Sequence, residues 1–65
     1  MSIKQPRFAV GDMVRERFPF ASTNRKTGMV IERYVFEHEY RYVVRFEDGQ
    51  EAVFFERELL AAPSD

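Results

Sequence analysis

The clearest hydrophobic pattern in the chain lies in residues 40–47, where apolar and polar positions alternate. Tyr42, Val44 and Phe46 occupy every second position and alternate with Arg41, Val43 and Arg45. Successive side chains of a β-strand point to opposite faces, so this period of two predicts a half-buried strand. The rings of Tyr42 and Phe46 and the side chain of Val44 are expected to face the core.

A hairpin turn is expected directly after this strand, at Asp48-Gly49. Glycine adopts a positive φ without a steric penalty, and aspartate tolerates it better than most residues. Residues 50–55 should then return antiparallel as a further strand. Residues 56–60 should close the unit with one short helical turn.

Two registers are open for this hairpin. A two-residue turn directs Val53 and Phe55 toward the core, whereas a turn with a glycine bulge directs Ala52 and Phe54 there instead. A slip of one residue exchanges every side chain between the two faces of a strand. One of Phe54 and Phe55 is therefore expected to point outward in either register.

Two further strands are expected before this hairpin. The first covers residues 13–18 and ends before Pro19, which lacks the amide hydrogen that central pairing requires. A polar loop follows at residues 20–27. Gly28 then indicates a bulge or a close backbone approach, where the next strand, residues 29–36, begins.

A three-residue turn at residues 37–39 is expected to join the second strand to the third. This turn length places Tyr34 opposite Tyr42 and brings the charged side chain of Glu32 to the core side. An extra residue in the strand would relieve that placement. We therefore expect a β-bulge near Val30-Ile31.

Length and composition limit the chain to one small domain. We expect a flexible lead-in at residues 1–6, a single domain at residues 7–61 and a short tail at residues 62–65. A chain of 65 residues buries only about 60% of its unfolded surface, so seven Phe and three Tyr are the expected means of building a core.

The absence of cysteine excludes disulfides and thiolate metal sites. No apolar run approaches the ~18 residues of a membrane span, and the expected location is the cytoplasm.

A series of short motifs runs from Phe8 to Leu60. It consists of Gly11-Asp12 with Val14, Gly28 with Val30, the Tyr-x-Val-x-Phe-x-Asp-Gly stretch at residues 42–49, and Glu58-Leu59-Leu60. This order of features resembles the Src-homology-3-like (SH3-like) small barrels. The resemblance implies an all-β fold, a small SH3-like barrel of about five antiparallel strands with one short terminal 3-10 turn. Such barrels include Tudor-like readers, KOW-type RNA binders, accessory subunits of photosynthetic and redox complexes, and the type II dihydrofolate reductases.

The type II dihydrofolate reductases are the only enzymes in that group. Residues 52–55, Ala-Val-Phe-Phe, occupy the place of the family's Val-Gln-Ile-Tyr strand. The Gln and Tyr that hold folate and nicotinamide would fall at Val53 and Phe55, where apolar side chains lack those hydrogen-bonding groups. The comparison therefore implies no reductase activity, and it favours the bulged register with Phe54 inward.

The sequence shows no constellation for catalysis or metal binding. His38 is the only histidine, and Glu37 and Glu39 beside it would point apart in a strand or a tight turn. We expect these residues to form a solvated turn, and the carboxylates around Asp48 to protect a sheet edge. No catalytic residue, metal ligand or cofactor is expected.

The best candidates for function are arginines and apolar residues on the strand faces turned away from the core. Neighbouring strands lie ~4.8 Å apart, so arginines on adjacent strands could form one patch. Exposed apolar residues beside them would mark an interface. The expected partner-binding residues are Arg33, Arg41, Val43, Arg45, Val53 and Phe55.

The leading hypothesis is a non-catalytic interaction module that binds a protein partner or further copies of itself. The alternative is an RNA- or DNA-binding module whose arginines contact phosphates and whose tyrosines stack on bases. The formal net charge of −1 gives no general attraction to nucleic acid, but a local basic face remains open. The arginines could equally pair with glutamates across the strands, which is routine in sheets.

Overall fold

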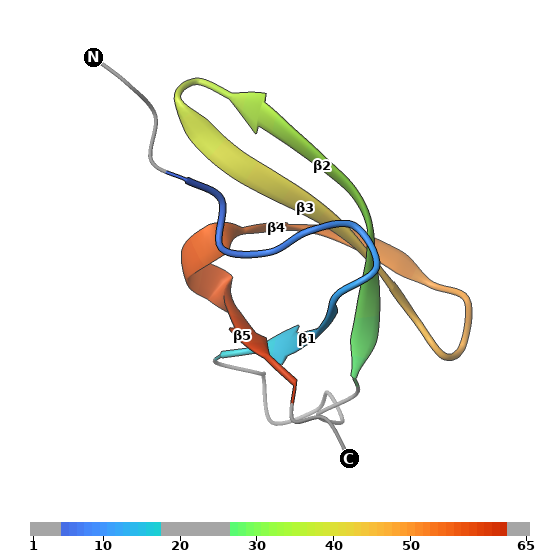
Figure 1. Ribbon diagram of the computed structural model, residues 1–65. Helices are drawn as coiled ribbons and strands as arrows, with labels where there is room; N and C mark the ends of the chain where they lie inside the picture. The colour runs from blue at the N-terminus through green and yellow to red at the C-terminus, as the bar shows by residue number, and fades with distance from the viewer. Residues whose placement is uncertain (1–4, 18–26, 63–65) are drawn as a thin grey trace.

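The structure, a computed structural model, describes residues 5–17 and 27–62. Its elements are β1 (Met13–Glu16), β2 (Gly28–Phe36), β3 (Glu39–Phe46), β4 (Glu51–Phe55), the 3-10 turn η1 (Glu56–Glu58) and β5 (Leu59–Ala61). All strand pairings are antiparallel, and one sheet has the order β4-β3-β2-β1-β5 (Figure 1). The expected fold class is confirmed: an all-β domain of five antiparallel strands with one 3-10 turn near its C-terminal end.

Parts of several segments that the sequence predicts lie outside the described residues. This applies to most of the lead-in, to Phe18, Pro19 and nearly all of the loop at residues 20–27, and to the end of the tail. The first strand, β1, ends at Glu16.

The fifth strand, β5, differs from the expectation for the C-terminal segment. The sequence pattern predicts only a helical turn at residues 56–60, whereas the turn ends at Glu58 and the chain then extends. In β5, Leu59 pairs with Glu16 and Leu60 pairs with Arg15 of β1, and the Leu59 side chain is fully buried. A strand of three residues is too short to show a period of two, so hydrophobic patterning alone could not identify it.

The hairpin of β2 and β3 turns over two residues, Glu37 and His38, which both have positive φ. The expected three-residue turn is therefore wrong, and Tyr34 lies opposite Arg41 rather than Tyr42. The expected bulge is confirmed, because the register shifts between Val30 and Glu32. Positive φ at both central residues gives the backbone twist that a two-residue hairpin needs.

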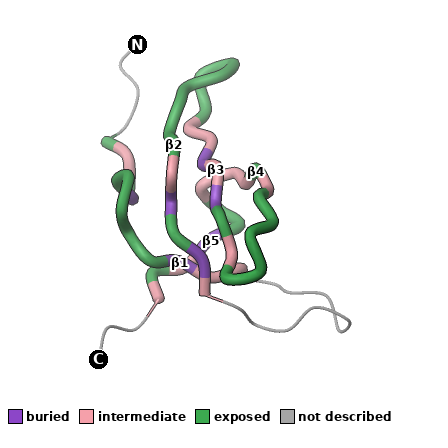
Figure 2. The backbone as a smooth tube through the Cα atoms, turned by 90° about the vertical axis from the view of Figure 1, so that its right-hand side faces the viewer, coloured by how far each residue is buried: buried purple, intermediate pink, exposed green. Residues whose placement is uncertain are grey.

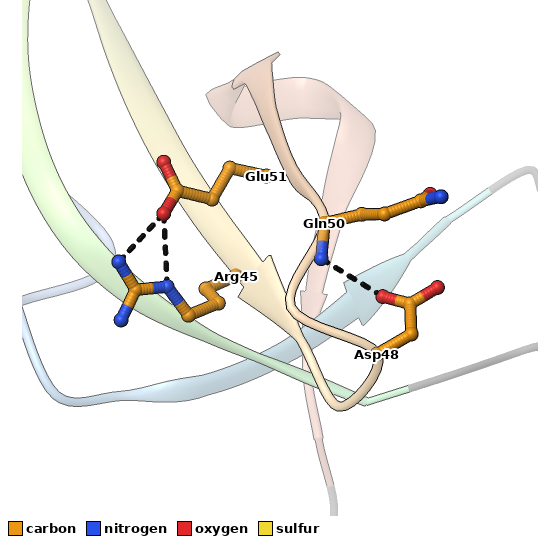
Figure 3. Close-up of polar contacts among 4 residues, drawn as sticks. All are labelled: Arg45, Asp48, Gln50 and Glu51. Carbon is orange, nitrogen blue, oxygen red and sulfur yellow. Dashed lines mark hydrogen bonds and ion pairs between the residues drawn. The ribbon is translucent and has the colours of Figure 1, made fainter.

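The hairpin of β3 and β4 takes the register with the glycine bulge. Gly49 has a φ of +86°, and its N–H donates to the Phe46 carbonyl at 2.9 Å. The Gln50 N–H donates to a carboxylate oxygen of Asp48 at 3.0 Å, which fixes the turn (Figure 3). Phe54 consequently lies opposite Tyr42 and packs against the core. This is the register with Phe54 inward, which the alignment of residues 52–55 favours.

The core is small and lies where β1 and β5 meet the first residues of β2 and the middle of β3 (Figure 2). Gly28 is buried at this junction, and a Cβ atom there would overlap a methyl group of Val44. The expected close backbone approach at Gly28 is thus confirmed. The buried apolar side chains are Phe8, Val14, Val30, Tyr42, Val44 and Leu59.

The N-terminal segment closes one side of this core. The Phe8 ring packs edge-on against Tyr42, with ring centroids 5.4 Å apart. The Tyr42 hydroxyl donates to a carboxylate oxygen of Glu56 at 2.7 Å, and the same oxygen accepts the Arg7 N–H at 3.0 Å. One carboxylate in η1 therefore ties the segment before β1 to the interior strand β3.

Candidate interaction surface

The side of β2, β3 and β4 that is turned away from the core forms one continuous surface, which we call the outer face. Directly opposed residues in an antiparallel pair share a face, so the register fixes its members. Arg41 lies between Phe55 and Tyr34, and Val43 lies between Val53 and Glu32.

Five of the six predicted partner-binding residues lie on the outer face. They are Arg41, Val43, Arg45, Val53 and Phe55. The exception is Arg33, which lies opposite Tyr42 and so belongs to the core side of the sheet. Its guanidinium Nη1 donates to the Phe8 carbonyl at 2.8 Å. The expected patch of Arg33 with Arg41 is therefore wrong.

The length of the β2–β3 turn explains the error at Arg33, because a two-residue turn places Arg33 rather than Tyr34 opposite Tyr42. The bulge then reconciles this register with the inward position of Val30. The bulge inserts one residue, Ile31, ahead of Arg33 without a partner in β3. Every later side chain of β2 is then exchanged between the two faces. The same shift brings Tyr34 and Phe36 to the outer face, although the sequence pattern did not single out Phe36 as part of a site.

Large apolar side chains are unusually exposed on the outer face. Val53 is 51% exposed, Phe36 50%, Met29 44% and Tyr34 37%. They come from β2 and β4, which flank β3, so the exposed apolar side chains belong to the surface of the sheet and not to a single loop. A contiguous apolar surface of this kind usually marks a site of interaction.

Two arginines and two phenylalanines alternate in a stack at one end of this face. The guanidinium carbon of Arg41 lies 4.9 Å from the ring centroid of Phe36 and 4.4 Å from that of Phe55. Arg57 of η1 covers Phe55 in turn, also at 4.4 Å. Each distance is short enough for a cation–π interaction, so Arg41 is held between two aromatic rings. Arg57 enters through tertiary packing, and no local pattern in the sequence indicates it.

Most of the charges on the outer face are already paired. Arg45 donates from Nε and Nη2 to one carboxylate oxygen of Glu51, at 2.9 and 2.6 Å (Figure 3). Arg57 donates to Glu39 at 3.0 Å. These pairs confirm, for Arg45 and Glu51, the cross-strand pairing that the sequence left open. They are exposed, so each contributes at most about 1 kcal/mol to stability.

Arg41 and Glu32 differ from these pairs. In the part of the chain that the structure describes, neither side chain makes a hydrogen bond or an ion pair. Arg41 Nε is buried without a partner, whereas its two terminal nitrogens are not among the buried unpaired atoms, and the residue as a whole is half-buried. The planar faces of the guanidinium are covered by rings, so only its outer edge is free to accept a ligand.

The histidine and the carboxylates near the turns form no further site. His38 is exposed at the β2–β3 turn. Across residues 5–17 and 27–62, no group of three His, Cys, Asp or Glu side chains is arranged to hold a metal ion. The same residues include no helix that is long and apolar enough to cross a membrane.

Comparison with known proteins places the chain in no family. No family model matches it, and no curated protein or solved structure matches it either.

Proposed function

We propose that this protein is a non-catalytic interaction module that binds a protein surface through the outer face of β2, β3 and β4. The observation that carries this proposal is the exposure of Val53, Phe36, Met29 and Tyr34 on one side of the sheet. A small domain with few buried residues gains stability when a partner covers such a surface. The five antiparallel strands and the terminal 3-10 turn support a relationship to the Src-homology-3-like barrels.

The charges of the outer face support a protein partner over RNA or DNA. Its three arginines, Arg41, Arg45 and Arg57, are matched by three glutamates, Glu32, Glu39 and Glu51. Nucleic-acid binding draws most of its affinity from cations that neutralise phosphates. A face with balanced charge and two arginines already paired offers little of that attraction.

The proposal is tested by comparing which proteins the tagged full-length chain retains from cell extract. Val53→Glu introduces a charge at the centre of the outer face. Val10→Glu is the matched control, because Val10 is 62% exposed but lies in the N-terminal segment. We expect the wild-type chain and Val10→Glu to retain the same protein, and Val53→Glu to lose it, because burying an unpaired charge opposes binding.

Treatment with nuclease distinguishes the alternatives in the same experiment. Retention that survives nuclease supports a protein partner. Retention that nuclease abolishes would favour the RNA- or DNA-binding alternative. Equal retention by Val53→Glu and Val10→Glu would show that the outer face is not the binding site.

A further inference from the structure

Among the described residues, the outer face carries one free cation, Arg41, and one free anion, Glu32, at diagonally adjacent positions. Arg45 and Arg57 are paired with glutamates of the same chain, whereas Arg41 and Glu32 have no such partner among the described residues. An arginine that is fixed between two rings cannot easily turn toward a new acceptor. The free edge of Arg41 therefore faces whatever covers this surface.

Two successive residue pairs of β2 and β3 on the outer face form a four-residue cell, and these two residues lie at its opposite corners. Arg41 lies opposite Tyr34, and Val43 lies opposite Glu32 two residues along the strands. The corners on one diagonal are thus Arg41 and Glu32. The corners on the other diagonal are the uncharged residues Val43 and Tyr34.

A two-fold axis that lies in the plane of contact, perpendicular to the diagonal from Arg41 to Glu32, exchanges these two corners. When a second copy is laid face to face across this axis, Arg41 of each copy meets Glu32 of the other. Val43 and Tyr34 lie beside the axis and meet their own counterparts. A two-fold interface requires this self-complementarity, in which residue i contacts j and j contacts i.

We infer that the outer face binds a second copy of this chain, with Arg41 of each copy paired to Glu32 of the other. The inference rests on the proposed function, because it names the partner of the same face. The contact supplies a carboxylate to both guanidinium groups, so neither arginine is covered without a counter-charge. The two terminal nitrogens of Arg41 can donate together to one carboxylate, which is the favoured geometry for this pair. Val43, Val53 and Tyr34 contribute the apolar area around the charges.

The test is the solution mass of charge-reversed chains, measured by light scattering from about 10 µM to about 1 mM, a range that covers weak dimers. We expect the wild-type mass to rise toward twice that of the monomer. Arg41→Glu places two glutamates in the cell, and Glu32→Arg places two arginines there. Each variant alone should self-associate at least about a hundredfold more weakly, because like charges then meet.

Mixing the two variants is the decisive step. A chain with Glu at 41 and 32 and a chain with Arg at both positions regain two opposite-charge contacts, so an equimolar mixture should form a heterodimer. Loss of folding cannot produce this result, and Glu32→Arg leaves the aromatic stack around Arg41 intact. Glu47→Arg is the matched control, because Glu47 is exposed in the β3–β4 turn. It should associate as the wild type does.

Two outcomes overturn the inference. A wild-type chain that stays monomeric over the whole range has no second copy as its partner. A dimer that persists in both variants, or a mixture that stays monomeric, means that the two residues do not meet. In either case the proposed function is judged separately, by whether Val53→Glu loses the protein retained from extract.

Discussion

Tyr42 combines a buried ring with a hydroxyl that bonds to a carboxylate. Its ring packs against Phe8, and its O–H donates to Glu56 at 2.7 Å. Burial of the phenol, together with the hydrogen bond to Glu56, raises the pKa of Tyr42 from 10.0 to about 12. Both effects favour the neutral hydroxyl in the folded chain, since a phenolate would be desolvated and would face a carboxylate.

We expect Tyr42→Phe to lower the free energy of unfolding at neutral pH by about 1–3 kcal/mol, because it removes a hydrogen bond to a charged acceptor. The measurement is urea unfolding of both chains. The ring contact with Phe8 is retained in the variant. A change within error would mean that the bond from Tyr42 to Glu56 contributes nothing net.

The same pair of chains gives an expected pH dependence. The folded-state pKa of Tyr42 is raised, so its contribution to stability is fully present below pH 10.0 and is lost as the pH rises toward about 12. Over this window the wild-type chain should lose about 2 kcal/mol more than Tyr42→Phe. The two other tyrosines, Tyr34 and Tyr40, are present in both chains, so the difference isolates Tyr42. Parallel curves for the two chains would contradict the raised pKa.

Individual residues show where a sequence pattern is sufficient and where it fails. Tyr42 and Val44 were predictable as core residues, because their alternation continues without interruption along β3. Arg33 was not, because its face depends on an upstream bulge at Ile31 and on the length of the following turn. Arg57 reaches the outer face only through the path of η1, which has no period of its own.

At the scale of the elements, the two hairpin turns meet the same backbone requirement with different residues. The β3–β4 turn places glycine at its positive-φ position, Gly49. The β2–β3 turn places Glu37 and His38 in the left-handed region, with φ of +52° and +66°. Such residues are uncommon in this conformation, so the sequence indicated a loop but not a two-residue turn.

Replacing Glu37-His38 by Asn-Gly should stabilise the protein by about 1 kcal/mol, because these residues adopt the left-handed region at lower cost. Both side chains are exposed, so the change removes no packing. Gly49→Ala is the opposite control. A Cβ atom at this position meets no atom within 4 Å, but the backbone φ is +86°, so the variant should be destabilised by about 1 kcal/mol. Thermal unfolding of the three chains checks both signs. A destabilised Asn-Gly chain would contradict the turn geometry.

At the scale of the whole molecule, the sheet is unequally supported along its length. The first residues of β2 pair with both β1 and β3, and the later residues of β3 pair with both β2 and β4. Beyond Arg33, the arm formed by residues 34–40 consists of the two strand ends paired with each other (Figure 1). Hydrophobic patterning predicts the strands that build this arm, but its extension beyond the pairings with β1 and β4 follows from register and bulge, which are tertiary properties.

This difference predicts the pattern of amide hydrogen exchange. Amides at Val30 and Val44, beside the buried core, should exchange ~100-fold or more slowly than those of the opposed residues Phe36 and Glu39, because the end of the arm can open without exposing a buried side chain. Exchange followed by NMR at low protein concentration tests this directly. Equal rates would mean that the arm opens only when the whole domain unfolds. If the outer face binds a second copy, exchange in the arm should slow as the concentration rises, because Tyr34 lies within that contact.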